Sequence, residues 1–427
     1  MAQLAGLRCV SPRSARCNRQ SCLWYSDVFF STRKSALTTQ SFLSFILPVI
    51  ALQYSMGVLV QLKGTAIYRM ALLPVLLWSA FRAANSIDLS GGNPMQAHNN
   101  ATFIAQMFSF AMRATIWAIA REPYWRGSRL SERVENPNSA ATALWNAFDL
   151  LINVRGIGWN WPSGLRIPAP TLKTNSRLHF VALSAARFAV YAFAYDATVE
   201  AIRAFSPQEF SSLTGGTIYD HSLPAGWQFL RCIAISFLTV WMAYFAMQWA
   251  YQMAAIVFVI LFQQHPLQWP PLFDAPWLST SLRDLWGRRW HQMMRHMLLS
   301  LGGQPFTYLL GRPGGVIGTF LLSGIFHDIE LRSVGRGGNS LVVIGFFTMN
   351  GVGVVLEWAW KKVVGKPVGG VLGWMWTFTW LALWGTPVVD EWAKAGRFGT
   401  DNLPGGFRPA MLVWSWVQPF LQRWAPM

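Results

Sequence analysis

The chain has 427 residues, of which 53% are hydrophobic and only 12% are charged. Its 24 Trp and 29 Phe outnumber its 18 acidic residues, which excludes an ordinary soluble domain and is typical of a polytopic membrane protein. The net charge of +17 does not indicate a nucleic-acid partner here. Arginines at the ends of membrane helices orient the fold and attract anionic lipid or an anionic cofactor.

The first 40 residues differ in composition from the rest. They are rich in arginine and serine, have Asp27 as their one acid, and hold three of the four cysteines. This composition superficially resembles a transit peptide; the other interpretation is a basic, disordered cytosolic tail or an extension outside the native protein. We predict a basic, disordered tail over 1–40 and a single membrane domain over 41–427.

Two apolar segments follow the tail. Ser41–Leu62 is long enough to span a membrane, and we expect Pro48 to kink it. Ile67–Phe81 is shorter and is bounded by Arg69 and Arg82. We expect this second segment to be a short span or a re-entrant segment.

A polar loop then leads to a third apolar segment. The loop, residues 85–100, ends in the sequon at Asn100, which matters only if the loop is luminal. Thr102–Ala120 has the length of a span, and the basic stretch 121–138 after it is the best candidate for a cytosolic loop. Ala140–Val154 is amphipathic, and we expect it to lie on the membrane surface.

The later segments complete a predicted bundle of about eight or nine membrane segments. Cys232–Phe262 would reach about 46 Å as one helix, well beyond the ~30 Å hydrocarbon core. It must therefore tilt, extend past the bilayer, or break near Gln248 and Gln252. A proline-rich loop over 266–276 ends it. The other predicted spans are Leu178–Phe193, Leu341–Trp360, Val371–Val388 and Pro409–Leu421.

Ionisable residues concentrate between Ser281 and Asp328, in an otherwise apolar neighbourhood. Such residues at membrane depth are costly and mark a functional site by default. Ser281–Met297 is expected to be a helix, with Ser281 as its cap, Asp284 as an imperfect capping box, and a pair between Asp284 and Arg288. One face of this helix would be cationic, with Arg288, His291 and Arg295. The neighbouring face would be apolar, with Trp286, Trp290 and Met297.

Gly315–Leu331 is the second half of this stretch. It is apolar apart from Ser323, His327, Asp328 and Glu330. A lone histidine on an apolar face is more often a satisfied core residue, and the cationic helix could be an interfacial helix with its arginines at lipid headgroups. The neighbouring acid, the second histidine and the nearby arginines favour a functional site instead.

Two other kinds of site fit less well. A transporter would also place charges at membrane depth, but no pair of broken helices repeats in the two halves. A metal site built from His291, His296 and His327 is disfavoured, because residues five apart on a helix lie on different faces. We expect no bound metal.

The motifs S-L-R-D-L-W-G-R-R-W-H-Q and S-G-I-F-H-D resemble the signature pair of the wax-synthase-like branch of the membrane-bound O-acyltransferase superfamily. The fungal members of that branch, many of which acetylate terpenoid or meroterpenoid alcohols with acetyl-CoA, resemble the chain most closely. Supporting similarity lies in Trp145–Trp159 and Phe346–Glu357, where Asn350 replaces the usual Gln. Leu285 likewise replaces the usual Phe of the first motif.

The resemblance implies an acyl-CoA-dependent O-acyltransferase in the endoplasmic reticulum membrane, with acetyl-CoA as co-substrate and a lipophilic alcohol as acceptor. A long-chain-alcohol O-fatty-acyltransferase would use the same machinery, and the sequence leaves tunnel size open. His327 matches the invariant histidine and is our candidate general base, and His291 is our candidate for holding the acyl carbonyl or the oxyanion.

Other residues of the motifs have supporting roles. Arg283, Arg288 and Arg289 are candidates for the CoA phosphates, with lipid headgroups or structural carboxylates as the alternative partners. Asp328 points about a hundred degrees away from His327 on a helix, so we do not assign it as the residue that orients that ring. The remaining supporting residues are Asp284, Trp286, Trp290, Asn350 and Glu357.

Overall fold

The computed structural model describes residues 34–127, 140–162, 165–169, 176–205, 210–334, 338–400, 403 and 407–424. Within these ranges the protein is almost entirely helical, and its two strands, β1 (Ser35–Ala36) and β2 (Ile87–Asp88), form one short parallel pair. Seven of the described helical segments are long and apolar enough to cross a membrane. The predicted all-α, polytopic class is confirmed.

The helical elements follow one another with few long connections. The longer helices are α3 (Leu47–Leu59), α4 (Ala66–Ser86), α5 (His98–Ile119), α6 (Ala140–Ile152), α7 (Arg177–Arg203), α8 (Ala225–Leu261), α11 (Gln304–Arg332), α12 (Ser340–Val364), α13 (Gly370–Lys394) and α14 (Pro409–Trp424). The short ones are α2 (Thr39–Ser41), α9 (Leu282–Asp284) and α10 (Arg295–Leu298), with π-helical turns η1 (Phe42–Ile46), η6 (Leu285–Arg289) and η7 (Leu299–Gly303). The 3₁₀ turns are η2 (Pro94–Gln96), η4 (Pro266–Gln268), η5 (Pro276–Leu278) and η8 (Arg397–Gly399). The predicted spans in α13 and α14 are helices, but they are not among the seven.

The first span begins at Thr39, and Pro48 lies in the first turn of α3, directly after an irregular turn. The helix is π-helical over η1, directly before this proline, whose ring cannot continue a regular hydrogen-bond ladder. Residues 34–40, assigned to the tail by sequence, form β1 and the start of α2. Residues 1–33 and most of the predicted basic loop 121–138 lie outside the described residues.

Helix α4 is longer than the predicted segment Ile67–Phe81, and it has the length and composition of a full span. Sequence analysis took Arg69 as a boundary, whereas the structure buries it inside the helix at 5% exposure. Its guanidinium donates to the carbonyl oxygens of Trp117 and Ala120, the latter at 2.9 Å. These carbonyls at the C-terminal end of α5 lack intrahelical partners, so the arginine satisfies them.

The sequon residue Asn100 lies inside α5, because this helix begins four residues before the predicted start. Its side chain is 9% exposed. The amide Nδ2 donates to Asp88 Oδ1 at 2.7 Å, and the amide oxygen accepts from the backbone N–H of Leu89 at 2.7 Å. Asn100 therefore fastens the β2 loop to the start of α5.

Helix α8 excludes one of the three options left open for the long apolar run, a break. It is one continuous helix of 37 residues, which corresponds to about 55 Å. It does not break near Gln248 or Gln252; both side chains are buried, and Gln248 donates to the Tyr244 hydroxyl at 2.9 Å. The helix thus tilts or extends beyond a bilayer of ordinary thickness.

The segment from α10 to α11 is a helical hairpin. Gly311 has φ of 70°, a left-handed conformation that interrupts α11 and that glycine adopts without strain. A Cβ at Gly302 would lie 2.5 Å from the carbonyl oxygen of Gly318, so the two arms pack backbone to backbone. This close packing fixes the two arms of the hairpin against each other.

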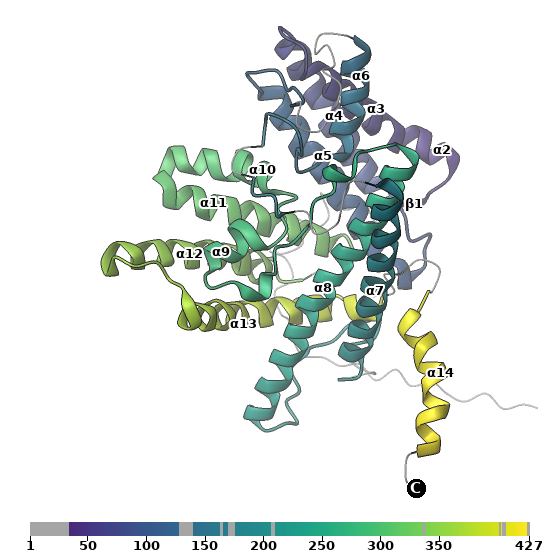
Figure 1. Cartoon of the computed structure of the whole chain (residues 1–427), viewed down its shortest axis with the longest axis vertical. Helices are drawn as coiled ribbons and strands as arrows, with labels where there is room; N and C mark the ends of the chain where they lie inside the picture. The colour runs from purple at the N-terminus through teal and green to yellow at the C-terminus, as the bar shows by residue number, and fades with distance from the viewer. Residues whose placement is uncertain are drawn as a thin grey trace, which may run out of the picture.

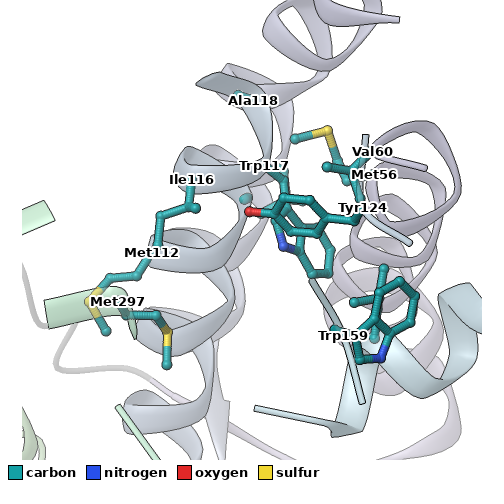
Figure 2. Packing of buried hydrophobic residues seen from close by; sticks show 12 residues of the cluster. Met56, Val60, Met112, Ile116, Trp117, Ala118, Tyr124, Trp159 and Met297 are labelled. Carbon is teal, nitrogen blue, oxygen red and sulfur yellow. The ribbon is translucent and has the colours of Figure 1, made fainter. Parts of the chain in front are cut away.

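Figure 1 shows α11, α12 and α13 stacked in layers on one side of the molecule, with α7 and α8 beside them. Helices α3 to α6 form a second group at the top of the view, and α14 lies apart from both groups, near α7. A buried cluster links helices α3 and α5 to the hairpin. It contains Met56 of α3, Val60 directly after α3, Met112 and Trp117 of α5, and Met297 of α10. Figure 2 shows these methionines between the helices, with the rings of Tyr124 and Trp159 nearby.

Candidate active site

Helix α9 is held at its N-terminus by two side chains. Ser281 accepts a hydrogen bond from the N–H of Asp284 at 2.9 Å, as its predicted capping role requires. The buried carboxylate of Glu357, on α12, accepts from the N–H groups of Leu282 at 2.6 Å and Arg283 at 3.0 Å. Helix N-termini carry unpaired donors and partial positive charge, so a carboxylate fits there.

The carboxylate of Asp284 binds arginines, so the predicted capping box is only half formed. Its oxygens accept from Arg288 at 2.9 Å and from Arg289 at 2.6 Å. Arg289 also donates to the backbone carbonyls of Asp274 and Ala275, at 3.0 and 3.3 Å. Arg289 therefore fixes the proline-rich loop to η6. The predicted pair of Asp284 with Arg288 is confirmed.

The predicted helix over Ser281–Met297 is wrong in its middle. It ends at η6, Trp290 is extended with φ of −74° and ψ of 156°, and helix resumes only at α10. Gln292 stabilises the break by donating from Nε2 to two carbonyl oxygens of η6, both at 3.1 Å. The cationic face proposed for Arg288, His291 and Arg295 therefore does not exist.

Two indole rings fasten this segment to the neighbouring helices. Trp286 donates from Nε1 to Asn350 Oδ1 at 3.0 Å, and Asn350 is fully buried on α12. Trp290 packs edge-on against Phe273 of the proline-rich loop, with ring centroids 4.9 Å apart. Phe273 also meets the ring of His291 edge-on at 5.9 Å. These contacts give structural roles to Trp286, Trp290 and Asn350.

The motif over Trp145–Trp159 supports the same loop from the other side. Arg155 donates to the carbonyl oxygens of Pro270 at 2.9 Å and Pro271 at 3.0 Å, and to the Tyr251 hydroxyl. Asp149 accepts from Trp159 Nε1 at 2.7 Å and from Gln268 at 3.1 Å, which adds a second buried attachment. Sequence analysis noted this motif but assigned none of its residues to the site.

His327 lies in a regular part of α11. Its ring stacks on Phe347 of α12 with centroids 4.5 Å apart and an interplanar angle of 6°. Nδ1 is 3.2 Å from Glu330 Oε2, one turn further along the same helix. The side chain is 32% exposed, so the ring retains an accessible edge.

Gly324, in the motif S-G-I-F-H-D, permits the contact between α11 and α12. A Cβ there would lie 2.9 Å from Cα of Ile344 and 3.0 Å from its carbonyl oxygen. Only glycine allows the two helices to approach this closely, and the approach brings Phe347 onto the His327 ring. The motif glycine therefore determines the setting of the histidine one turn away.

Asp328 faces away from the histidine, as its position predicts. It is 4% exposed, and its Oδ2 accepts from Arg332 at 3.0 Å and from the Ser340 hydroxyl at 2.7 Å. This group ties the end of α11 to the start of α12. Asp328 therefore stabilises the connection between the two helices.

His291 and His327 are 36 residues apart in the chain, and His327 acts electrostatically on the His291 ring. Burial, the nearby His327 and the charge of Arg155 lower the pKa of His291 to about 3. His291 therefore stays neutral at physiological pH, and its Nδ1 is enclosed without a hydrogen-bond partner in the described protein. A neutral imidazole with an unused ring nitrogen can hold a carbonyl oxygen.

The third histidine of the stretch lies in a different setting. The His296 ring packs against Trp161 with centroids 4.6 Å apart. Among the residues that the structure describes, no group of three His, Cys, Asp or Glu side chains is placed to hold a metal ion.

Sequence reasoning missed two residues that contact the His327 ring. Phe347 is within a motif it noted, but no pattern in the sequence indicates that this ring stacks on a histidine from another helix. Glu330 could have been found, because residues three apart on a helix are neighbours.

Comparison with known proteins finds similarity to acyltransferases. The model of the membrane bound O-acyl transferase family matches residues 269–349. A long-chain-alcohol O-fatty-acyltransferase of Simmondsia chinensis is 35% identical over 23% of this chain and 30% of its own. An acyl-CoA–sterol O-acyltransferase of Arabidopsis thaliana is 31% identical over 32% of this chain and 46% of its own. An acetyltransferase of an Arthrinium species is 25% identical over 64% of this chain and 75% of its own.

The matches to the Simmondsia and Arabidopsis proteins span less than half of those relatives. The family match covers most of the proline-rich loop, α9, the hairpin and Phe347, and it includes both histidines. Together with the seven candidate membrane helices, these findings make the chain a multi-pass membrane protein. Over residues 269–349 it is similar to the membrane-bound O-acyltransferase family, and its relatives include long-chain-alcohol acyltransferases and fungal acetyltransferases.

Proposed function

We propose that this protein is an acyl-CoA-dependent O-acyltransferase of the endoplasmic reticulum membrane. Its reaction transfers an acetyl group from acetyl-CoA to a hydroxyl of a lipophilic alcohol, such as a terpenoid or meroterpenoid. The observation that carries the proposal is that His291 and His327 both lie in the segment similar to acyltransferases, where His327 acts electrostatically on His291. One histidine is accessible and held at Nδ1, and the other is neutral with an unused nitrogen.

His327 acts as the general base in this mechanism. Its Nε2 takes the proton of the acceptor hydroxyl as the alcohol oxygen attacks the thioester carbonyl. His291 donates to the carbonyl oxygen, on which negative charge develops, and this donation stabilises the tetrahedral intermediate. The carbon–sulfur bond then breaks, and the proton on His327 passes to the departing CoA thiolate. The products are the ester and free CoA, and no other reactant is needed.

The CoA phosphates are proposed to bind arginines at η6 and α9. Arg283 supports this role best, because its side chain is exposed and has no hydrogen bond or ion pair among the described residues. Arg288 shares Asp284 but is 39% exposed, so it can also reach a phosphate. Arg289 is the weakest candidate, since a carboxylate and two backbone carbonyls already occupy its donors.

The choice of acetyl rather than a longer acyl group rests on similarity. The Arthrinium acetyltransferase matches over 75% of its length, whereas the Simmondsia long-chain enzyme matches over 30% at higher identity. That higher identity makes the transfer of a long acyl chain to a fatty alcohol the second candidate. In both cases the acceptor enters from the lipid, and the CoA nucleotide stays in the cytosol because it is too anionic to cross a bilayer.

The experiment is a substrate panel. Microsomes that contain the protein are incubated with labelled acetyl-CoA or palmitoyl-CoA and with terpenoid and fatty alcohols, and microsomes with His327→Ala are the control. Acetyl ester formation on a terpenoid alcohol, absent from the control, supports the proposal. Palmitoyl esters alone would favour the second candidate, and no ester from any pair would reject acyl transfer.

A labelling experiment tests the arginine role and the side on which the site opens. Arg283→Cys is treated with an impermeant maleimide in sealed microsomes oriented with the cytosolic face outward. We expect labelling from the cytosolic side and protection by acetyl-CoA. Labelling that no acyl-CoA reduces would remove Arg283 from the phosphate site.

A further inference from the structure

We propose that Glu330 is the positioning residue of His327: its carboxylate holds the ring through Nδ1 and leaves Nε2 free to take the acceptor proton. This inference rests on the proposed function of His327 as the base. It assigns the orienting role to the acid three residues after the histidine and not to its immediate neighbour Asp328.

The geometry at Nδ1 is the first step of the argument. Glu330 Oε2 lies 3.2 Å from Nδ1, and both side chains project from one face of α11. A carboxylate can only accept, so Nδ1 must carry the hydrogen in this contact. The tautomer that follows has its lone pair on Nε2, as a base requires.

The second step is that the ring is held in two independent ways. Phe347 covers one face of the imidazole in a parallel stack, and Glu330 holds its Nδ1. A ring held by a face and by one nitrogen cannot rotate without losing one of these contacts. The direction of Nε2 is therefore determined before substrate binds, which is how an acid next to a catalytic histidine contributes to rate.

The third step is that the competing acid is occupied. Asp328 is bound to Arg332 and Ser340, and its side chain is 6% exposed. Glu330 has no arginine or lysine within ion-pair distance among the described residues, and its side chain is 26% exposed. Arg397 of η8 and His98 of α5 act on it electrostatically from neighbouring elements. The ring of His327 also interacts electrostatically with His291.

The chemical consequence concerns the charged intermediate. When Nε2 takes the hydroxyl proton, the imidazole becomes an imidazolium, and the adjacent carboxylate compensates its charge until the proton passes to the CoA thiolate. Without that carboxylate the proton transfer loses this stabilisation, and the ring can adopt the other tautomer. Substrate binding does not depend on Glu330, so the effect belongs in kcat and not in KM.

The test uses Glu330→Gln in the full chain, with Glu200→Gln as the matched control. Glu200 lies on α7, has a similar exposed fraction of 33%, and pairs with Arg203 and Arg408 instead of a histidine. We expect Glu330→Gln to lower kcat by about 100-fold or more with little change in KM for acyl-CoA. The acidic limb of its kcat profile should move to lower pH by about one pH unit. Glu200→Gln should leave both unchanged, and a Glu330→Gln enzyme with the wild-type profile would overturn the inference.

A second variant and a second readout keep the result independent of folding and of turnover. Glu330→Asp keeps the charge but retracts it by one methylene, so we expect kcat to fall about tenfold; wild-type kcat would overturn the inference. Carbethoxylation of His327, followed by mass spectrometry against pH, reports on the neutral ring in protein that need not turn over. Its midpoint should be lower in Glu330→Gln than in wild type, and equal midpoints would refute the positioning role even if no substrate of the enzyme were known.

Discussion

The two candidate catalytic histidines are held in opposite ways. His327 is on a regular helix, and a glycine contact and an aromatic stack between α11 and α12 set its surroundings. His291 is on a non-helical segment between η6 and α10, in a region held by polar contacts from two other parts of the chain. Three side chains from these parts make the contacts: Glu357 and Asn350, both on α12, and Arg155, which follows α6.

This difference separates two ways of building one site. Packing between helices is local to the interface and tolerates no added volume, so His327 depends on shape. Buried polar clamps depend on each partner, because an unpaired buried group costs about 1–3 kcal/mol. The site therefore combines a base in a rigid position with a second histidine whose place depends on hydrogen bonds elsewhere.

Removal of the base should have the largest effect on activity. His327→Ala should lower kcat by at least about 100-fold at unchanged membrane abundance, because general-base catalysis typically contributes that much. The measurement is ester formation per amount of protein in microsomes. Retention of more than about a tenth of the rate would mean that another group takes the proton.

Substitution of the second histidine should have a smaller effect that depends on polarity. His291→Asn keeps a donor near the carbonyl oxygen and should retain measurable activity, whereas His291→Leu should lose most of it, by about tenfold or more relative to Asn. The measurement is kcat of both variants and of the wild type under the same conditions. Equal activities of the two variants would show that His291 serves only to fill space.

A change of shape tests the packed side of the comparison. Gly324→Ala should lower the free energy of unfolding by about 1–3 kcal/mol, because its Cβ would meet the Ile344 backbone. Gly345→Ala, on α12 where a Cβ would meet nothing within 4 Å, is the matched control and should not destabilise. Thermal unfolding in detergent measures both. Similar values for the two variants would contradict the close contact.

The smallest expected effect is the pH dependence that His291 gives to stability. Its pKa is lowered to about 3 from the ordinary 6.5, so the unfolded chain binds a proton that the folded chain excludes. Stability from this residue is therefore fully present above pH 6.5 and is lost as the pH falls from 6.5 toward 3. The loss of melting temperature between pH 7 and pH 5 should be smaller in His291→Asn than in wild type, and an identical loss would argue against neutral burial.

The sequence was sufficient for elements in which composition decides the structure. Apolar runs located most of the helices, whereas the reversal at Gly311 was not predicted. The Asp284–Arg288 pair followed from spacing alone, because neighbours on a helix surface are set by geometry. The spacing of residues on α11 allowed His327 to be proposed and Asp328 to be set aside for the same reason, but Glu330 was given no role.

Tertiary contacts decided what the sequence could not predict. The residues over Ser281–Met297 have a helical pattern, but Gln292 and the proline-rich loop favour an extended conformation at Trp290. Arg69 appears as a boundary in the sequence because nothing there reveals the carbonyl oxygens of α5 that receive it. Partners distant in sequence outweigh local preference at these positions.

The pairing of Arg69 with α5 has a consequence for how the protein is made. A charged residue inside a membrane segment resists insertion when the segment is alone, and α4 has a mean hydropathy of only 1.2 in its most apolar window. The carbonyl groups that receive the guanidinium belong to a helix synthesised later. We therefore expect α4 to insert more stably when α5 follows it than when it is made alone.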